Sequence, residues 1–164
     1  MTLTQPYALS VDLLRRMHMP TDRDSAPVEI LLIEDSSDDA DLMARALKAG
    51  SMNLRVTVVE DGEEAMNYLR RKGPFATAPE PDLILLDLHL PRMTGHEVLA
   101  EIKEDASLRR LPIVIMTSSV DENDFQIAYE LHANCCVSKP TDHEEFTLAV
   151  QKIEAFWRRV ARHA

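Results

Sequence analysis

Four short apolar runs, each followed or ended by polar residues, constrain the fold of this chain more than any other feature. The runs ILLI, LILL, IVIM and CCVS stand directly before Glu34-Asp35, Asp87, Thr117 and Lys139. Strands of a parallel sheet that is buried on both faces are written as continuous apolar runs, whereas half-exposed strands alternate. We therefore expect these runs to be strands of one parallel sheet, with the polar residues at its carboxyl edge.

This edge is where open α/β folds bind their ligands. Three carboxylates, a hydroxyl and an ammonium would meet there. Crowded carboxylates repel one another and favour a hard divalent cation, whereas lysine and threonine favour an anion such as phosphate. The combination predicts a site that accepts a phosphoryl group. Two further acidic residues nearby, Asp38 and Asp39, are interpreted as cap or turn residues of the helix that follows.

The rest of the chain predicts a regular alternation of strands and helices. Five strands alternating with five helices imply right-handed crossovers and a doubly wound α/β fold with helices on both faces of a parallel sheet. Residues 28–164 are predicted to form this domain, and residues 1–27 a tail or an arm that docks on a partner. The strands are expected at 28–34, 54–59, 82–87, 112–117 and 134–138, and the helices at 37–48, 63–71, 96–105, 121–131 and from about 142 onward.

Composition excludes several classes of partner and site. The formal net charge is −10 without a compensating basic stripe, which argues against nucleic-acid binding. No apolar stretch approaches the roughly 20 residues that a membrane-spanning helix needs, so we expect no membrane partner and a cytoplasmic location. Cys135 and Cys136 are adjacent, which favours buried thiols in a strand over a disulfide or a zinc site.

Five motifs occur in an order and spacing that closely resemble the receiver domains of two-component response regulators, from residue 28 to about 153. Two further segments are similar to the stand-alone regulators that partner bacterial and cyanobacterial phytochromes, which are light-sensing histidine kinases. The resemblance implies a flavodoxin-like strand order 2-1-3-4-5, and a sensor histidine kinase, expected to be a bacteriophytochrome, as partner. The five motifs are LLIEDS (31–36), DGEEA (61–65), LILLDLHLPRMTG (83–95), IVIMTSS (113–119) and SKP (138–140), and the two segments are YELHANC (129–135) and EAFW (154–157).

The resemblance also assigns roles to the residues at the predicted edge. Asp87 would take the phosphoryl group from a phosphohistidine of the kinase, a transfer that needs positioning and charge neutralisation. Asp35 and Asp87 would ligate Mg²⁺ directly. Glu34 would act through a water molecule, and His89 would contribute its backbone carbonyl while its side chain stays solvated.

The remaining roles concern the response to phosphorylation. Lys139 would pair with a phosphoryl oxygen, and its bond to Pro140 is expected to be cis by family analogy. Thr117 would donate its hydroxyl to the phosphoryl group and act as the switch. The family usually carries Tyr or Phe at the position of Cys136, so either Thr117 and its loop carry the change alone or the response is smaller.

The last helix is the predicted output surface. No segment is long enough for a separate effector domain, so we expect signalling through the surface of the domain itself. Phe146, Ile153, Phe156 and Trp157 belong to an apolar stripe at helical spacing. Phe156 and Trp157 are predicted to extend beyond the domain and to favour a homodimer. The alternative is that Trp157 folds back onto its own domain.

Two other functions compete with that of a signalling phosphoacceptor. A magnesium-dependent hydrolase of small phosphorylated molecules would want a second aspartate two residues after Asp87, where His89 stands. An adaptor that is not phosphorylated would have lost the acidic cluster or Lys139, and both are present. We therefore expect no enzyme activity beyond phosphotransfer to the chain itself and hydrolysis of its own aspartyl phosphate.

Overall fold

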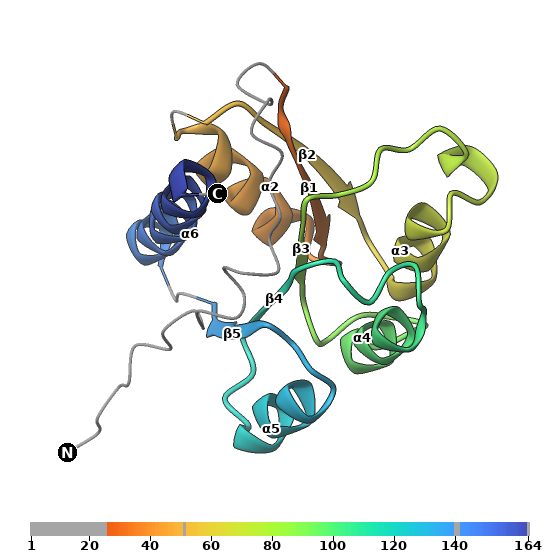
Figure 1. Cartoon of the computed structure of the whole chain (residues 1–164). Coiled ribbons are helices and arrows are strands. Elements are labelled where there is room, and N and C mark those ends of the chain that lie inside the picture. The colour runs from red at the N-terminus through yellow and green to blue at the C-terminus, as the bar shows by residue number, and fades with distance from the viewer. Residues whose placement is uncertain (1–25, 51, 140–141, 164) are drawn as a thin grey trace.

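Five parallel strands form one sheet in the order β2-β1-β3-β4-β5, which confirms the predicted strand order (Figure 1). The computed structural model describes residues 26–50, 52–139 and 142–163, so most of the predicted extension and the Lys139–Pro140 bond lie outside the described residues. The elements in chain order are β1 (Val28–Ile33), α2 (Ser37–Lys48), β2 (Leu54–Val59), α3 (Gly62–Leu69), the 3₁₀ turn η1 (Gly73–Phe75), β3 (Leu83–Leu86), α4 (Gly95–Glu104), β4 (Ile113–Thr117), α5 (Glu122–Glu130), β5 (Cys135–Ser138) and α6 (His143–His163).

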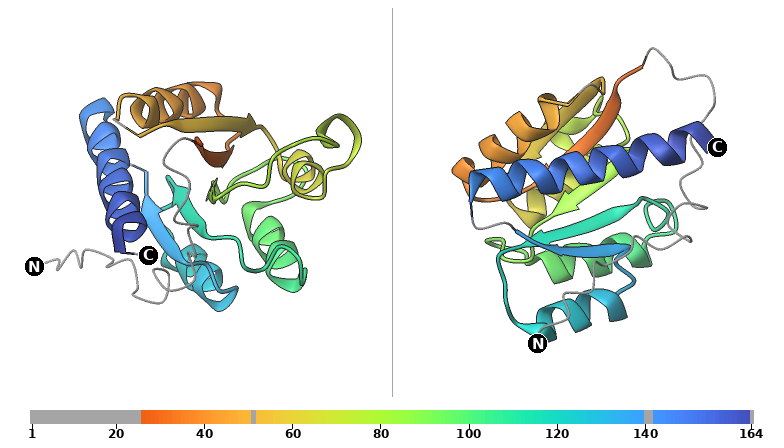
Figure 2. Two further views of the ribbon diagram at one scale, coloured as in Figure 1. Left: turned by 45° about the horizontal axis from the view of Figure 1, so that its top comes forward. Right: turned by 90° about the vertical axis from the view of Figure 1, so that its left-hand side faces the viewer.

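Helices cover both faces of the sheet, so its inner strands β1, β3 and β4 are largely apolar and buried, whereas the edge strand β2 is partly exposed. Successive side chains of a strand point to opposite faces. In β1, Leu31 and Ile33 therefore enter one core, whereas Ile30 and Leu32 enter the other. The first core lies under α3, α4 and α5, and the second under α2 and α6 (Figure 2). A strand that is buried on both faces has apolar residues at successive positions and not at alternate ones.

Side-chain caps start helices α2, α3, α4 and α5 close to the carboxyl edge of the sheet. Ser36 caps α2 by accepting a hydrogen bond from the amide of Asp39 at 3.3 Å. Asp61 caps α3, and Thr94 with Glu97 forms a capping box at the start of α4. Such caps satisfy amide groups that the helix itself leaves without partners. They fix the direction in which each helix leaves the edge that carries the candidate site.

Close backbone contacts hold the loop that follows β3. A Cβ atom added at Gly95 would lie 2.2 Å from the carbonyl oxygen of Asp87, and one at Gly62 would lie 2.3 Å from that of Met93. Only glycine allows backbones to approach so closely. The guanidinium of Arg92 pairs with the buried carboxylate of Asp61 and joins the same loop to the start of α3. The segment directly after Asp87 is therefore anchored on two sides.

Helix α6 covers the second core together with α2, and Figure 2 shows the two helices on the same side of the sheet. Trp157 is 5% exposed and packs in that core with Val150. Ile153 is partly buried against it. The prediction that Trp157 extends beyond the domain is therefore wrong, and the alternative that it folds back is confirmed. The side chains of Phe146 and Phe156 lie outside the described residues.

The two cysteines are buried free thiols, as the sequence predicts. Cys135 enters the core under α2 and α6, and Cys136 enters the opposite core, because neighbouring residues of a strand face opposite sides of the sheet.

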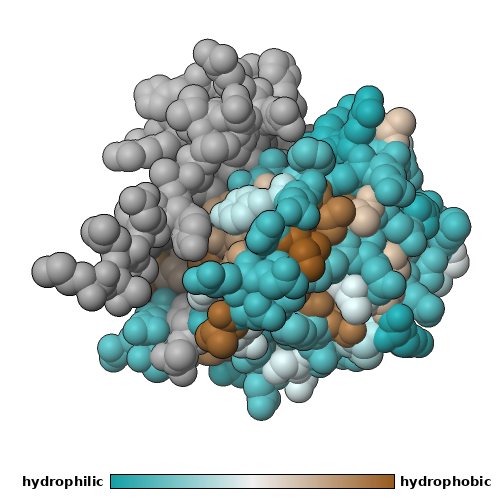
Figure 3. Space-filling view, turned by 90° about the horizontal axis from the view of Figure 1, so that it is seen from below, coloured by the Kyte–Doolittle hydropathy of each residue, from teal (hydrophilic) through white to brown (hydrophobic). Residues whose placement is uncertain are grey.

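Within the described ranges, none of the helices combines the length and apolar character that crossing a membrane requires. The coloured part of the surface in Figure 3, seen from below, is mainly hydrophilic, with apolar residues in small separate groups.

Candidate functional site

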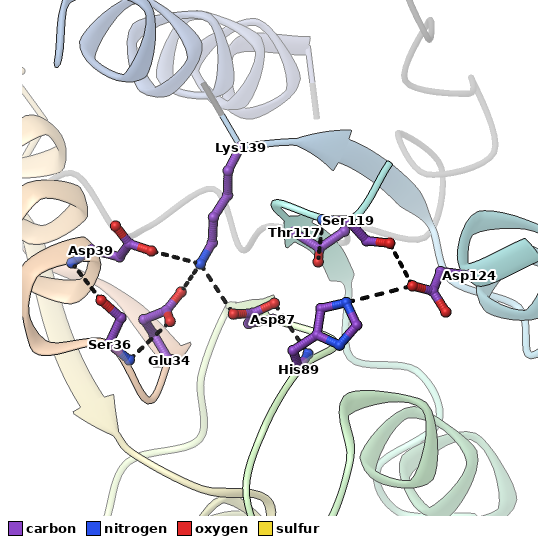
Figure 4. Close-up of polar contacts among 9 residues, drawn as sticks. All are labelled: Glu34, Ser36, Asp39, Asp87, His89, Thr117, Ser119, Asp124 and Lys139. Carbon is purple, nitrogen blue, oxygen red and sulfur yellow. Dashed lines mark hydrogen bonds and ion pairs between the residues drawn. The ribbon is translucent and has the colours of Figure 1, made fainter. Parts of the chain in front are cut away.

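The predicted site residues lie at the carboxyl ends of four strands. Glu34 and Asp35 follow β1, Asp87 follows β3, Thr117 is the last residue of β4, and Lys139 follows β5. The order of the strands makes β1, β3, β4 and β5 consecutive neighbours. Residues more than one hundred positions apart in the chain therefore meet at one edge (Figure 4).

The ammonium of Lys139 is the centre of this arrangement. It pairs with the carboxylate of Glu34 and lies 3.1 Å from an oxygen of Asp87 and 3.1 Å from an oxygen of Asp39. The side chains of Lys139, Glu34 and Asp87 are 7%, 4% and 6% exposed, whereas that of Asp39 is 43% exposed. A buried ammonium with several carboxylate partners is held in one position, because leaving them would strand buried charges.

Burial and mutual charge set the protonation of this group. Burial is the largest effect on Glu34 and raises its pKa to about 7, against the opposing hydrogen bond from Lys139. Burial alone would lower the pKa of Lys139, but the hydrogen bond to Glu34 and the charge of Asp87 raise it above its usual value. The ammonium is therefore charged at neutral pH. Three carboxylates contact this single positive charge, and Asp35 adds a fourth carboxylate beside Glu34 and Asp87.

Three of the carboxylates can hold a divalent metal ion. One oxygen each of Glu34, Asp35 and Asp87 lie within 4.8 Å of one another. Asp35 is exposed, whereas the other two are buried. Carboxylate oxygens are the ligands of hard divalent cations, and the surplus of negative charge around Lys139 is what such a cation would neutralise. The donor set fits the metal that the sequence predicts at this edge.

Asp87 is also fixed from the side of the loop that follows it. Its Oδ1 accepts a hydrogen bond from the amide of His89 at 3.3 Å, while its Oδ2 faces Lys139. The backbone amide of Asp87 donates to the carbonyl of Ile33 at 3.0 Å. Both oxygens of the carboxylate thus have a defined direction before any ligand arrives.

Thr117 is buried and lies to the right of Asp87 in Figure 4. Its hydroxyl oxygen accepts a hydrogen bond from the amide of Ser119 at 3.2 Å. Ser119 in turn donates its hydroxyl to Asp124 at 2.5 Å. Because the hydroxyl oxygen accepts this hydrogen bond, its own O–H can be donated to a group that binds beside it. The loop after β4 is therefore linked to α5.

The side chain of His89 is 61% exposed, and its Nε2 lies 3.5 Å from Asp124. The sequence predicts a solvated side chain, and the structure adds this contact. His96 also reaches the backbone carbonyl of Asp124, at 3.0 Å. The carboxylate of Asp124 thus joins the loop after β3 to the loop after β4 (Figure 4). Its backbone carbonyl adds a contact to the start of α4. Residues far apart in the sequence create this connection, so no local signal points to it.

The structure corrects the interpretation of Asp39 as a residue of the helix start alone. Its amide is capped by Ser36, but its carboxylate reaches Lys139. In the sequence, the role of Asp39 could have been inferred from its place one helical turn after Asp35, in the first turn of the helix that leaves the site.

Cys136 is fully buried, and burial raises the pKa of its thiol to about 12. Its side chain lies in the core under α5 and not at the site.

Comparison with known proteins agrees with this geometry. The family model of the response regulator receiver domain matches residues 30–151, most of the chain. The response regulator Rcp1 of Synechocystis sp. is 42% identical over 137 residues, which make up 84% of this chain and 93% of Rcp1.

Solved structures give the same result. The phosphorylated cyanobacterial phytochrome response regulator RcpA is 45% identical, with a TM-score of 0.78 over 80% of this chain and 94% of RcpA. The Mn²⁺-bound form of Rcp1 is 43% identical, with a TM-score of 0.76 over the same shares of the two chains. With the strand order, the acidic cluster and the lysine in place, the chain belongs to the response regulator receiver domain family.

Proposed function

We propose that the chain is a phosphoacceptor of a two-component pathway and that Asp87 is the residue phosphorylated. The observation that carries this proposal is the buried Asp87 carboxylate, which lies 3.1 Å from the Lys139 ammonium and within 4.8 Å of carboxylate oxygens of Glu34 and Asp35. A carboxylate oxygen of Asp87 would attack the phosphorus of a phosphohistidine. The phosphorus–nitrogen bond breaks, an acyl phosphate forms, and the leaving electron pair returns to the imidazole.

The proposed metal is Mg²⁺. Asp35 and Asp87 would bind it directly, Glu34 through a water molecule, and His89 through its backbone carbonyl. When bound, Mg²⁺ supplies positive charge that offsets the repulsion between carboxylates and phosphoryl oxygens. The Mn²⁺-bound structure of Rcp1 supports a divalent metal at the corresponding place in this chain.

Two side chains would act on the phosphoryl oxygens. The ammonium of Lys139 would give up its contact with Asp87 and donate to one oxygen. The hydroxyl of Thr117 would donate to another, and its hydrogen bond from Ser119 would carry the movement into the loop before α5. This route begins at Thr117 and needs no aromatic ring at position 136.

The two competing functions have less support. A phosphohydrolase would place a general acid two residues after Asp87, but His89 stands there with an exposed side chain in contact with Asp124. An adaptor that is not phosphorylated has no need for a buried lysine among carboxylates, which is costly to keep. The phosphoacceptor accounts for both features.

Labelling with acetyl phosphate tests the proposal. Intact-mass measurement should show one added phosphoryl group on the wild type in Mg²⁺ and none after chelation with EDTA. Asp87→Asn should remain unlabelled, while Asp38→Asn, on the exposed start of α2, should label like the wild type. Label on Asp87→Asn would show that another residue is the acceptor.

The proposed partner is a sensor histidine kinase of the bacteriophytochrome type. The support is the likeness to RcpA, which is described as a phytochrome response regulator. A cytoplasmic location would follow, because such a kinase takes its phosphoryl group from ATP. Phosphotransfer from a purified phytochrome kinase should be faster than transfer from a histidine kinase without a light sensor. Equal rates would remove the phytochrome assignment.

We also propose that the chain signals as a homodimer built on α6, within a receiver domain that spans residues 28–164. Since Trp157 and Ile153 belong to the chain's own core, the exposed face of the helix, with Leu148 at 54% exposure, is the surface left for a second copy. Light scattering at micromolar concentration should give the mass of a dimer for the wild type and of a monomer for Leu148→Glu. A monomeric wild type, with and without phosphorylation, would refute the dimer.

A further inference from the structure

We propose that Asp39 is a positioning residue for phosphotransfer, which holds the ammonium of Lys139 on the α2 side of the site. The inference rests on the proposed role of Asp87. Asp39 contacts Lys139 at 3.1 Å, the same distance as the contact between Lys139 and Asp87. Figure 4 shows the ammonium between these two carboxylates, with Glu34 beside it. The site thus contains a carboxylate beyond the three of the candidate metal cluster.

The number of N–H donors on the Lys139 ammonium explains why a fourth carboxylate, that of Asp39, lies at the site. A lysine ammonium has three N–H donors and no acceptor. In the structure these donors meet Glu34, Asp39 and Asp87. When Asp87 becomes esterified, one donor must turn to a phosphoryl oxygen. The other two contacts, with Glu34 and Asp39, then determine where the ammonium stands.

Glu34 has other partners, whereas Asp39 is free of the metal cluster. One oxygen of Glu34 accepts the amide of Ser36 at 3.1 Å, and Glu34 also belongs to the acidic cluster. Asp39 is outside that cluster among the described residues. It stands in the first turn of α2, whose start is fixed by the Ser36 cap. The helix therefore presents its carboxylate to Lys139 from a fixed direction.

Loss of Asp39 would change the position of the ammonium. Glu34 and Asp87 would be its only remaining partners in the described site, and these are two of the carboxylates that a divalent metal needs. The ammonium would then compete more strongly with the metal and lie closer to the oxygen that must attack phosphorus. Both effects slow phosphorylation, and only the first is removed by a saturating concentration of Mg²⁺.

The first experiment compares Asp39→Ala with Asp38→Ala. The two residues are neighbours in the first turn of α2 and carry the same charge, but Asp38 is exposed. At saturating Mg²⁺ we expect Asp39→Ala to be phosphorylated by acetyl phosphate roughly three- to tenfold more slowly than the wild type, the size of effect expected for a charged hydrogen bond at a half-exposed site. Asp38→Ala should stay within about twofold. Asp39→Asn, which keeps an acceptor oxygen, should fall between wild type and Asp39→Ala. Equal rates for the two alanine variants would refute the inference.

A double-mutant cycle tests whether Asp39 acts through Lys139. In the Lys139→Met background, Asp39→Ala should cause no further slowing. The same fold loss in both backgrounds would show that Asp39 acts independently of Lys139 and would overturn the proposal. Urea unfolding of the same four proteins without Mg²⁺ gives a second measure that needs no phosphorylation. Additive effects in that cycle would equally overturn the proposal.

The controls separate this inference from the proposed function. If the wild type takes no label while Asp39 and Lys139 remain coupled in unfolding, the role of Asp87 fails and the contact stands. If the wild type labels, Asp87→Asn does not, and Asp39→Ala labels at the wild-type rate, only the role of Asp39 fails. Titration of Mg²⁺ into the alanine variants adds a readout without turnover, in which Asp39→Ala should bind the metal more weakly than Asp38→Ala.

Discussion

Replacing Lys139 with methionine should destabilise the protein most in the absence of divalent metal. The lysine is 7% exposed and neutralises two carboxylates, those of Glu34 and Asp87, that are 4% and 6% exposed. Removing one partner of a buried pair costs about 3–5 kcal/mol, because the other charge stays buried without compensation. We expect about 3 kcal/mol, the lower end, since Glu34, with its pKa near 7, can take up a proton.

Magnesium should reverse much of this loss. Without the ammonium, the surplus negative charge at the edge is larger, so the variant should bind Mg²⁺ more tightly than the wild type. A ligand at one hundred times its dissociation constant stabilises the folded state by about 2.7 kcal/mol. The gain in unfolding free energy on adding Mg²⁺ should therefore be larger for Lys139→Met than for the wild type, even though the variant loses the proposed partner of the phosphoryl group.

Urea unfolding followed by fluorescence measures both effects. The single tryptophan, Trp157, is 5% exposed and reports on unfolding of the core under α2 and α6. Lys72→Met is the control, because Lys72 is exposed and surface changes stay within about 0.5 kcal/mol. If Lys139→Met unfolds at the wild-type urea concentration and gains no more from Mg²⁺, the ammonium does not neutralise buried carboxylates.

Three further outcomes test the packing of the loop after β3 and of the two cores. Gly95→Ala should destabilise the fold by about 3 kcal/mol and slow labelling of Asp87, because the added Cβ would stand 2.2 Å from the Asp87 carbonyl oxygen; wild-type stability in urea would contradict this. Trp157→Ala should cost about 3–5 kcal/mol without changing the oligomeric mass, and dissociation of a dimer without loss of stability would restore Trp157 to the interface. Burial raises the pKa of the Cys136 thiol from 9.0 to about 12, so the stability that this thiol contributes is complete below pH 9 and is lost as the pH rises toward 12. Because the thiol is fully buried, a thiol reagent at pH 8 should react with Cys136 only as fast as the protein unfolds.

The sheet and its carboxyl edge could be predicted because both depend on short, local sequence patterns. A strand with two buried faces must be apolar at every position, and the polar residue that follows marks where it ends. Parallel pairing then places Glu34, Asp87, Thr117 and Lys139 at one edge without any knowledge of loops. The helices could be predicted as well, since caps such as Ser36 lie in the sequence directly before them.

The contacts between elements could not be predicted in this way. The reach of Asp39 to Lys139 depends on how α2 is turned relative to the end of β5, which no local pattern sets. The apolar stripe of the last helix shows which of its faces is buried but not what covers it. Trp157 is covered by the chain itself because α6 continues along the same core as α2. The ion pair of Arg92 and Asp61 joins loops 31 positions apart.

The most direct test of the account is a crystal structure grown with Mn²⁺ and the phosphoryl mimic beryllium fluoride. We expect one anomalous peak between Asp35 and Asp87 and the mimic attached to the Asp87 carboxylate, with Lys139 and Thr117 donating to its fluorine atoms. A metal peak elsewhere, or a mimic bound to another side chain, would contradict the claim that this edge of the sheet is built to phosphorylate Asp87.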